Sequence, residues 1–181
     1  MTTLIDPKMT MQELEHAYPG ARRALFRRYH IGGCASCGFR ADETLAEVCT
    51  RNDNLSVDEV IEHLAASEEA DRKMQIEPAE LDTLRKSDPA STKLIDVRTR
   101  EEFDAVHIDG AILLNQPLMQ EIVGSWDKQS RLVFIDHQGT RSMDAAAYFV
   151  GHGFANARSL RGGIDAWSVE VDPKLARYSL A

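Results

Sequence analysis

The 181-residue sequence lacks any apolar run of the roughly 18 to 20 residues that a membrane-spanning helix requires. Its first residues lack the basic start and apolar stretch of a secretory signal. It also lacks an excess of positive charge, because the formal net charge is -8. Nucleic acid and anionic membranes are therefore poor candidates for its main partner. We expect a cytoplasmic protein, and the sequence leaves its oligomeric state open.

Cysteine is scarce and confined to the first third of the chain. The three residues are Cys34, Cys37 and Cys49. An odd number of cysteines in one short region argues against a disulfide framework and suits a reducing compartment.

The first part of the chain has the pattern of short helices. Thr10 can cap the first of them, and Ser56 with Glu59 forms the capping-box pattern that begins the last. The expected helices span 11–18, 21–29, 42–51 and 56–66. We therefore expect a small all-α domain over 1–66. The charged stretch that follows can serve as a linker over 67–75 or as an extension of the last helix.

From residue 76 to residue 181 the pattern changes to alternating strands and helices. The expected strands are 93–97, 111–114, 131–135 and 156–160, and the expected helices are 78–86, 100–106, 118–123, 141–151 and one that begins at 163–167. Such alternation is typical of an α/β domain with a mostly parallel sheet that helices cover on both faces. This half of the chain is expected to be the second domain.

The stretch "FIDHQGTRS", residues 134–142, joins an expected strand to an expected helix. A loop of this kind places backbone N–H groups and a helix N-terminus around an anion. The residue at the head of the loop is Asp136, a carboxylate.

Three blocks of the second domain resemble the signatures of rhodanese-like domains. They are "LIDVRTREEFDAVHIDGAILLN" (94–115), "VFIDHQGTRS" (133–142) and "LRGGIDAW" (160–167), in the order that the family keeps. The resemblance implies a five-stranded parallel sheet flanked by helices. Val106 stands where the family usually has glycine before the His-Ile pair.

In active members of that family the loop begins with a cysteine, which carries a sulfane sulfur as a persulfide. Asp136 stands at the matching position, and a carboxylate cannot form a persulfide. The resemblance therefore implies a degenerate loop in which no residue is a confident catalytic candidate. Its members are Asp136, His137, Gln138, Gly139, Thr140 and Arg141.

Four charged or titratable residues in or near the loop are expected to have structural rather than catalytic roles. Arg141 is expected to pair with Asp136 or to bind backbone carbonyls, and His137 to be an exposed loop residue rather than a proton donor. Asp96 and Arg98 are expected to form a salt bridge that orients loops.

The cysteines form a candidate metal or sulfur site. Cys34-Ala-Ser-Cys37 can turn two sulfurs to one side, and Cys49 can add a third ligand, with His30, solvent or a partner as the fourth. Zinc, iron or an iron-sulfur cluster would suit these ligands. The alternative is that the thiols are buried packing residues, above all Cys49, which shares a helix face with Leu45 and Val48.

Residues 4–65 resemble a small helical domain associated with hybrid-cluster proteins and the N-terminal domain of iron-sulfur-cluster-repair proteins. The resemblance rests on a cysteine-containing turn followed by "TLAEVC", residues 44–49. The repair proteins have adjacent cysteines, whereas this chain separates Cys34 from Cys37.

Three functions follow from these patterns. The preferred one is a non-catalytic rhodanese-like accessory, docking or sensor protein of sulfur or iron-sulfur metabolism that works with a protein partner. The second is a sulfurtransferase in which Cys34 or Cys37 carries the persulfide. The third is a purely structural interaction protein with inert thiols.

Overall fold

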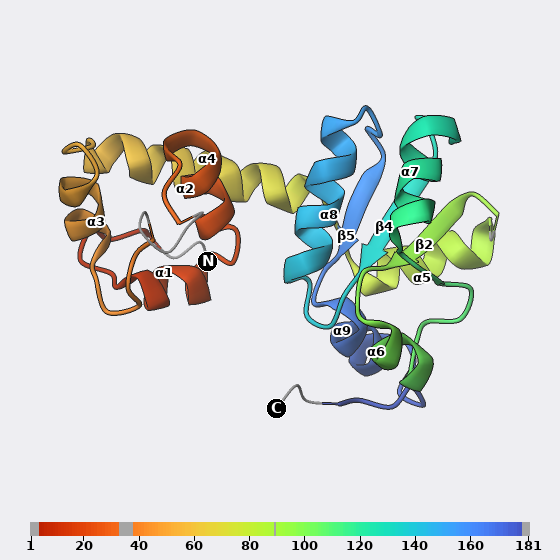
Figure 1. The fold of residues 1–181 in the computed structure, drawn as a ribbon. Coiled ribbons are helices and arrows are strands. Elements are labelled where there is room, and N and C mark those ends of the chain that lie inside the picture. The colour runs from red at the N-terminus through yellow and green to blue at the C-terminus, as the bar shows by residue number, and fades with distance from the viewer. Residues whose placement is uncertain (1–3, 33–37, 89, 179–181) are drawn as a thin grey trace. The chain divides into compact units, whose positions relative to one another are not determined.

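The computed structural model describes residues 4–32, 38–88 and 90–178 (Figure 1). The chain divides into two compact units, Met1–Arg72 and Lys73–Ala181. Within the described ranges, no helix is both long enough and apolar enough to cross a membrane.

The first unit is built from four helices, two of which begin with a capping box. The helices are α1 (Met11–Ala17), α2 (Ala21–Tyr29), α3 (Leu45–Arg51) and α4 (Val57–Lys73). Thr10 and Thr44 each close a capping box at the start of a helix, with Glu13 and Glu47 as the reciprocal partners. The helix α4 continues seven residues past the expected end at residue 66, so most of the segment 67–75 is helical.

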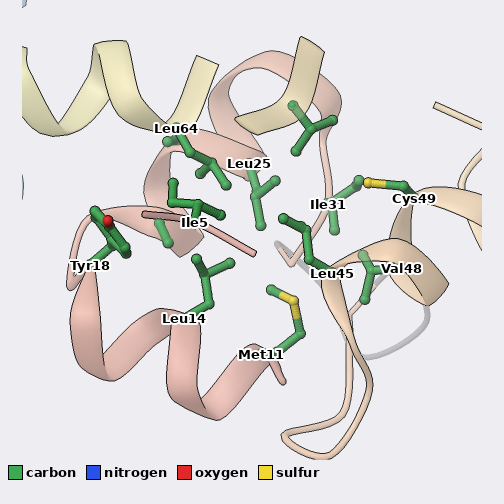
Figure 2. Packing of buried hydrophobic residues seen from close by; sticks show 13 residues of the cluster. Ile5, Met11, Leu14, Tyr18, Leu25, Ile31, Leu45, Val48, Cys49 and Leu64 are labelled. Carbon is green, nitrogen blue, oxygen red and sulfur yellow. The ribbon is translucent and has the colours of Figure 1, made fainter. Parts of the chain in front are cut away.

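The core of this unit is a cluster of apolar side chains from all four helices (Figure 2). Fully buried members include Met11, Leu14, Leu25, Leu45 and Val60. Burying each such side chain contributes about 1.5–3 kcal/mol, which is the main source of stability for helices this short.

The second unit is a five-stranded parallel sheet flanked by helices, with strand order β1-β5-β4-β2-β3. The strands are β1 (Gln75–Ile76), β2 (Thr92–Asp96), β3 (Ile112–Leu113), β4 (Arg131–Ile135) and β5 (Ala157–Leu160). The helices are α5 (Pro78–Ser87), α6 (Arg100–Ala105), α7 (Gln116–Ser125), α8 (Thr140–Gly151) and α9 (Gly163–Glu170). The α/β fold class expected from the sequence is confirmed, and β1 is the strand that the sequence pattern did not reveal.

The central strand β4 is buried on both of its faces. Val133 and Ile135 join a cluster with residues of α5 and α9, whereas Leu132 and Phe134 join a cluster with residues of α7 and α8. Successive side chains of a strand point to opposite faces, so this alternation places α5 and α9 on one face of the sheet and α7 and α8 on the other.

All strands of the sheet run in the same direction, so their carboxyl ends lie along one edge. In the register between β2 and β4, Asp96 is the partner of Ile135, the residue before Asp136. The backbone N–H of Val97 also donates to the carbonyl of Ile135. The segments that follow β2 and β4 therefore leave the sheet side by side.

Candidate functional site

The loop between β4 and α8 is organised around the carboxylate of Asp136, whose residue is 3% exposed. Its Oδ1 accepts hydrogen bonds from the backbone N–H of Gly139 (2.5 Å) and the hydroxyl of Ser142 (2.9 Å). Its Oδ2 accepts from the backbone N–H of Arg141 (2.8 Å). Three donors from the loop and the first turn of α8 thus converge on one carboxylate.

These contacts make Asp136 the anion at the N-terminus of α8. The N-cap residue, Gly139, has no side chain to cap the helix and adopts a left-handed φ of 96°. A carboxylate in this place satisfies helix N–H groups that would otherwise lack partners, and it lies at the positive end of the helix dipole. Ser142 extends the network to β5, because its hydroxyl lies 2.8 Å from that of Ser159.

A second helix N-terminus closes the loop from the other side. The N–H groups of Ile164 and Asp165, in the first turn of α9, donate to the carbonyls of Asp136 (2.9 Å) and His137 (3.2 Å). Gly163, with a φ of 60°, lies so close to these two residues that a Cβ atom would collide with their backbone. This close approach explains why the "LRGGIDAW" segment needs glycine at this position.

The expected salt bridge between Asp96 and Arg98 is confirmed, and both side chains are fully buried. The guanidinium donates to Asp96 through Nε (3.0 Å) and NH2 (2.7 Å), and NH2 also donates to the carbonyl of Val106 (2.7 Å). The pair therefore ties the end of β2 to the end of α6. Val106 has an extended φ of -160°, which any residue adopts, so this turn does not need the glycine usual in the family.

The structure corrects two expectations for the loop. His137 is only 8% exposed, rather than an open loop residue, because its ring stacks on Tyr178 with 4.4 Å between ring centroids. Arg141 contacts Asp136 through its backbone N–H, and its exposed guanidinium makes no ion pair with any described residue. A backbone contact is sufficient because the first turn of a helix already directs its N–H groups at the carboxylate.

The other loop residues are Gln138 and Thr140, which are exposed. Sequence reasoning missed Tyr178, which lies far from the loop along the chain and carries no motif. Periodicity offers no signal for such a contact, because an irregular segment supplies it.

The candidate metal ligands are only partly visible. Cys34 and Cys37 lie outside the described residues. Cys49 is 1% exposed among the apolar side chains of the first unit (Figure 2), and burial raises the pKa of its thiol. His30 is exposed and ends α2 in the left-handed conformation. Among the residues that the structure describes, no group of three or more His, Cys, Asp and Glu could hold a metal ion.

Comparison with known proteins matches residues 77–170 to the model of the rhodanese-like domain. Thiosulfate sulfurtransferase GlpE of Shewanella oneidensis is 36% identical over 77 residues, which cover 42% of this chain and 76% of GlpE. The adenylyltransferase and sulfurtransferase UBA4 of Candida albicans is 27% identical over 173 residues, which cover 90% of this chain but only 38% of UBA4. Among solved structures, the human single-domain sulfurtransferase TSTD1 is 26% identical, with 54% of this chain and 96% of that chain covered and a TM-score of 0.44.

The contact between α9 and the loop predicts the effect of one substitution. Gly163→Ala should lower the free energy of unfolding of the second unit by at least about 2 kcal/mol, because it adds both a backbone collision and a strained φ. Chemical denaturation followed by tryptophan fluorescence measures this, since both tryptophans, Trp126 and Trp167, lie in that unit.

Gly124→Ala is the matched control. Gly124 lies in α7 with nothing within 4 Å of the added Cβ, so the change should be neutral or should stabilise by about 0.5–1 kcal/mol. Equal stabilities of the two variants would show that α9 does not need its close approach to the loop.

Proposed function

Because this chain belongs to the rhodanese-like family, we propose that it serves sulfur or iron-sulfur metabolism as a non-catalytic accessory, docking or sensor protein. The observation that carries this proposal is that the anion-binding donors of the loop, here called the cradle, are already occupied by Asp136. The N–H groups of Gly139 and Arg141 and the hydroxyl of Ser142 all donate to the carboxylate of Asp136. Donors that would stabilise a bound persulfide are thus used by the chain itself.

The chemistry of Asp136 supports the same conclusion. Sulfur transfer requires a nucleophile that forms a bond to the sulfane sulfur, releases the donor's remainder and later yields that sulfur to an acceptor. A carboxylate does not do this, and its negative charge repels an incoming anion such as thiosulfate. We expect no persulfide at this loop.

An enzymatic role is the alternative, and the relatives named as sulfurtransferases are the observation that favours it. In that case Cys34 or Cys37 would carry the persulfide in place of a loop cysteine. Both roles imply a protein partner in sulfur or iron-sulfur handling.

Cyanolysis of the purified protein separates the two roles. With thiosulfate and cyanide, the unmodified chain should release no thiocyanate above the level of a Cys34→Ser/Cys37→Ser double variant, because Asp136 cannot accept sulfur and we propose that Cys34 and Cys37 hold a metal rather than a persulfide. Thiocyanate that forms with the unmodified chain and disappears with the double variant would establish the sulfurtransferase instead.

Asp136→Cys should convert the loop into a sulfur carrier. The three donors would then stabilise a thiolate, which attacks thiosulfate, breaks its S–S bond, releases sulfite and becomes a persulfide. Cyanide then removes the outer sulfur as thiocyanate and restores the thiolate. The mass of the variant should rise by one sulfur atom after thiosulfate treatment.

Asp136→Ser is the control for this gain. It removes the carboxylate and keeps a small side chain beside the same donors, yet it cannot hold sulfur. An Asp136→Cys variant that folds but gains no sulfur would show that the donors are not placed to stabilise a persulfide. The occupied cradle would then not explain why this loop forms no persulfide.

We further propose that Cys34 and Cys37, with His30, hold zinc, iron or an iron-sulfur cluster in the first unit. Cys49 fits this set poorly, because its burial among apolar side chains and its raised pKa favour the neutral thiol over the thiolate that metals bind. Its more natural role is packing.

Elemental analysis and absorption spectra after anaerobic purification test the metal site. We expect metal that falls strongly in Cys34→Ser and Cys37→Ser but is retained in Cys49→Ala. Metal-free, colourless protein would contradict the site, and loss in Cys49→Ala with the fold intact would return that residue to the ligand set.

A further inference from the structure

The chain beyond α9 folds back onto the site through its side chains. Leu175 and Tyr178 pack against the cluster that contains Trp167, and the guanidinium of Arg177 donates to both oxygens of Asp165 (2.7 and 3.0 Å). Arg177 also lowers the pKa of Asp165. Residues 172–178, here called the strap, belong to no helix or strand.

The backbone of the strap is weakly held. The N–H of Asp172 donates to Trp167 and the N–H of Leu175 to Asp172. Within the described part of the chain, no backbone hydrogen bond involves residues 176–178. Its end therefore stays in place through side chains, and solvent weakens the bidentate ion pair of Arg177 because the arginine side chain is 59% exposed.

Tyr178 supplies the most specific of these contacts. Its ring lies nearly parallel to that of His137, with an interplanar angle of 11°. Its hydroxyl accepts a hydrogen bond from NH1 of Arg98 (2.8 Å) and donates one to Oε1 of Glu102 (2.9 Å). A hydroxyl that both accepts and donates meets both partners, and burial together with the bond to Glu102 raises the pKa of Tyr178, which keeps its proton in place.

Two of the groups that receive this phenol are fixed independently of it. Asp96 and the carbonyl of Val106 hold Arg98, and a capping box with Thr99 holds Glu102. The backbone carbonyl of His137 is bound by α9, and none of the described residues offers a hydrogen-bond partner to its buried Nδ1. The polar part of the site is therefore preformed, whereas the occupant sits on a segment with few backbone hydrogen bonds.

We propose that Arg98, Glu102 and His137 form a binding site for a phenol side chain, which the strap fills with Tyr178 and vacates for a tyrosine of a partner protein. The chemistry of the partner follows from that of the occupant: a flat ring to stack on His137 and a hydroxyl to bridge Arg98 and Glu102. This site goes beyond the proposed function, because it does not depend on the sulfur chemistry of the loop.

Tyr178→Ala tests whether the strap covers the site. The reaction of His137 with diethyl pyrocarbonate, mapped by mass spectrometry with exposed His16 as an internal reference, should become at least about tenfold faster. Tyr148→Ala is the matched control, because the ring of Tyr148 lies against His152 instead and its loss should leave His137 protected. An unchanged rate at His137 in Tyr178→Ala would overturn the proposal.

Small phenols test the chemistry of the site in the same variant. Millimolar 4-methylphenol, the side chain of tyrosine, should restore protection of His137, whereas 4-methylanisole, which cannot donate to Glu102, should not. Equal protection by both compounds, or by neither, would refute phenol recognition. Tyr178→Phe, which keeps the ring, should leave His137 partly protected and guards against an effect of unfolding.

The unmodified chain tests displacement. Trypsin can cut the strap after Lys174 and Arg177, and 4-methylphenol should speed both cuts by competing with Tyr178, whereas 4-methylanisole should not. Cleavage that is indifferent to 4-methylphenol would show that the strap is a fixed part of the fold. None of these results depends on thiocyanate release, so their failure is distinguishable from failure of the proposed function.

Discussion

The carboxylate of Asp136 is the point at which the elements of the second unit meet. It follows the central strand β4, accepts hydrogen bonds at the start of α8, and reaches β5 through Ser142 and Ser159. A buried charge is tolerable only where several hydrogen bonds replace the water that it loses. Three donors meet that need, and each such bond to a charged group contributes about 1.5–3 kcal/mol. The loop therefore adopts the conformation that directs these three donors at the carboxylate of Asp136.

The same constraint shapes the neighbouring segments. With its side chain committed to α8, Asp136 has only its carbonyl left to bind α9, and that bond requires the close approach at Gly163. On the neighbouring strand, the buried pair of Asp96 and Arg98 likewise joins two segments, because it connects the end of β2 to the turn after α6. Two buried carboxylates thus lie at the carboxyl edge of the sheet, one paired with a guanidinium and one bound by neutral donors, and both stabilise chain connections.

The sequence predicted the parts of this arrangement that are local or periodic. The strand 131–135, the helix from about residue 141, the Asp96–Arg98 pair and the helix after Gly163 all follow from patterns of a few residues. Two-residue β1 is too short to show a period, and the stack of His137 on Tyr178 joins residues that no pattern links. The sequence suggests a side-chain contact for Arg141, because residue types reveal only what a side chain can do. The contact with Asp136 comes instead from the backbone N–H of Arg141, whose direction is set by the fold.

The loop around Asp136 has little conformational freedom, whereas the strap that contacts His137 has more. Replacing Asp136 disturbs donors on α8 directly, whereas Tyr178 contacts the loop through the ring of His137. Contacts held by a few side chains on an irregular segment open at lower free energy than contacts within packed elements. Replacing Tyr178 by a partner's tyrosine therefore requires less reorganisation of the fold than replacing any contact of Asp136. A rhodanese-like domain whose central carboxylate is permanently satisfied can still recognise other molecules there, because recognition by Arg98, Glu102 and His137 uses none of the donors that Asp136 occupies.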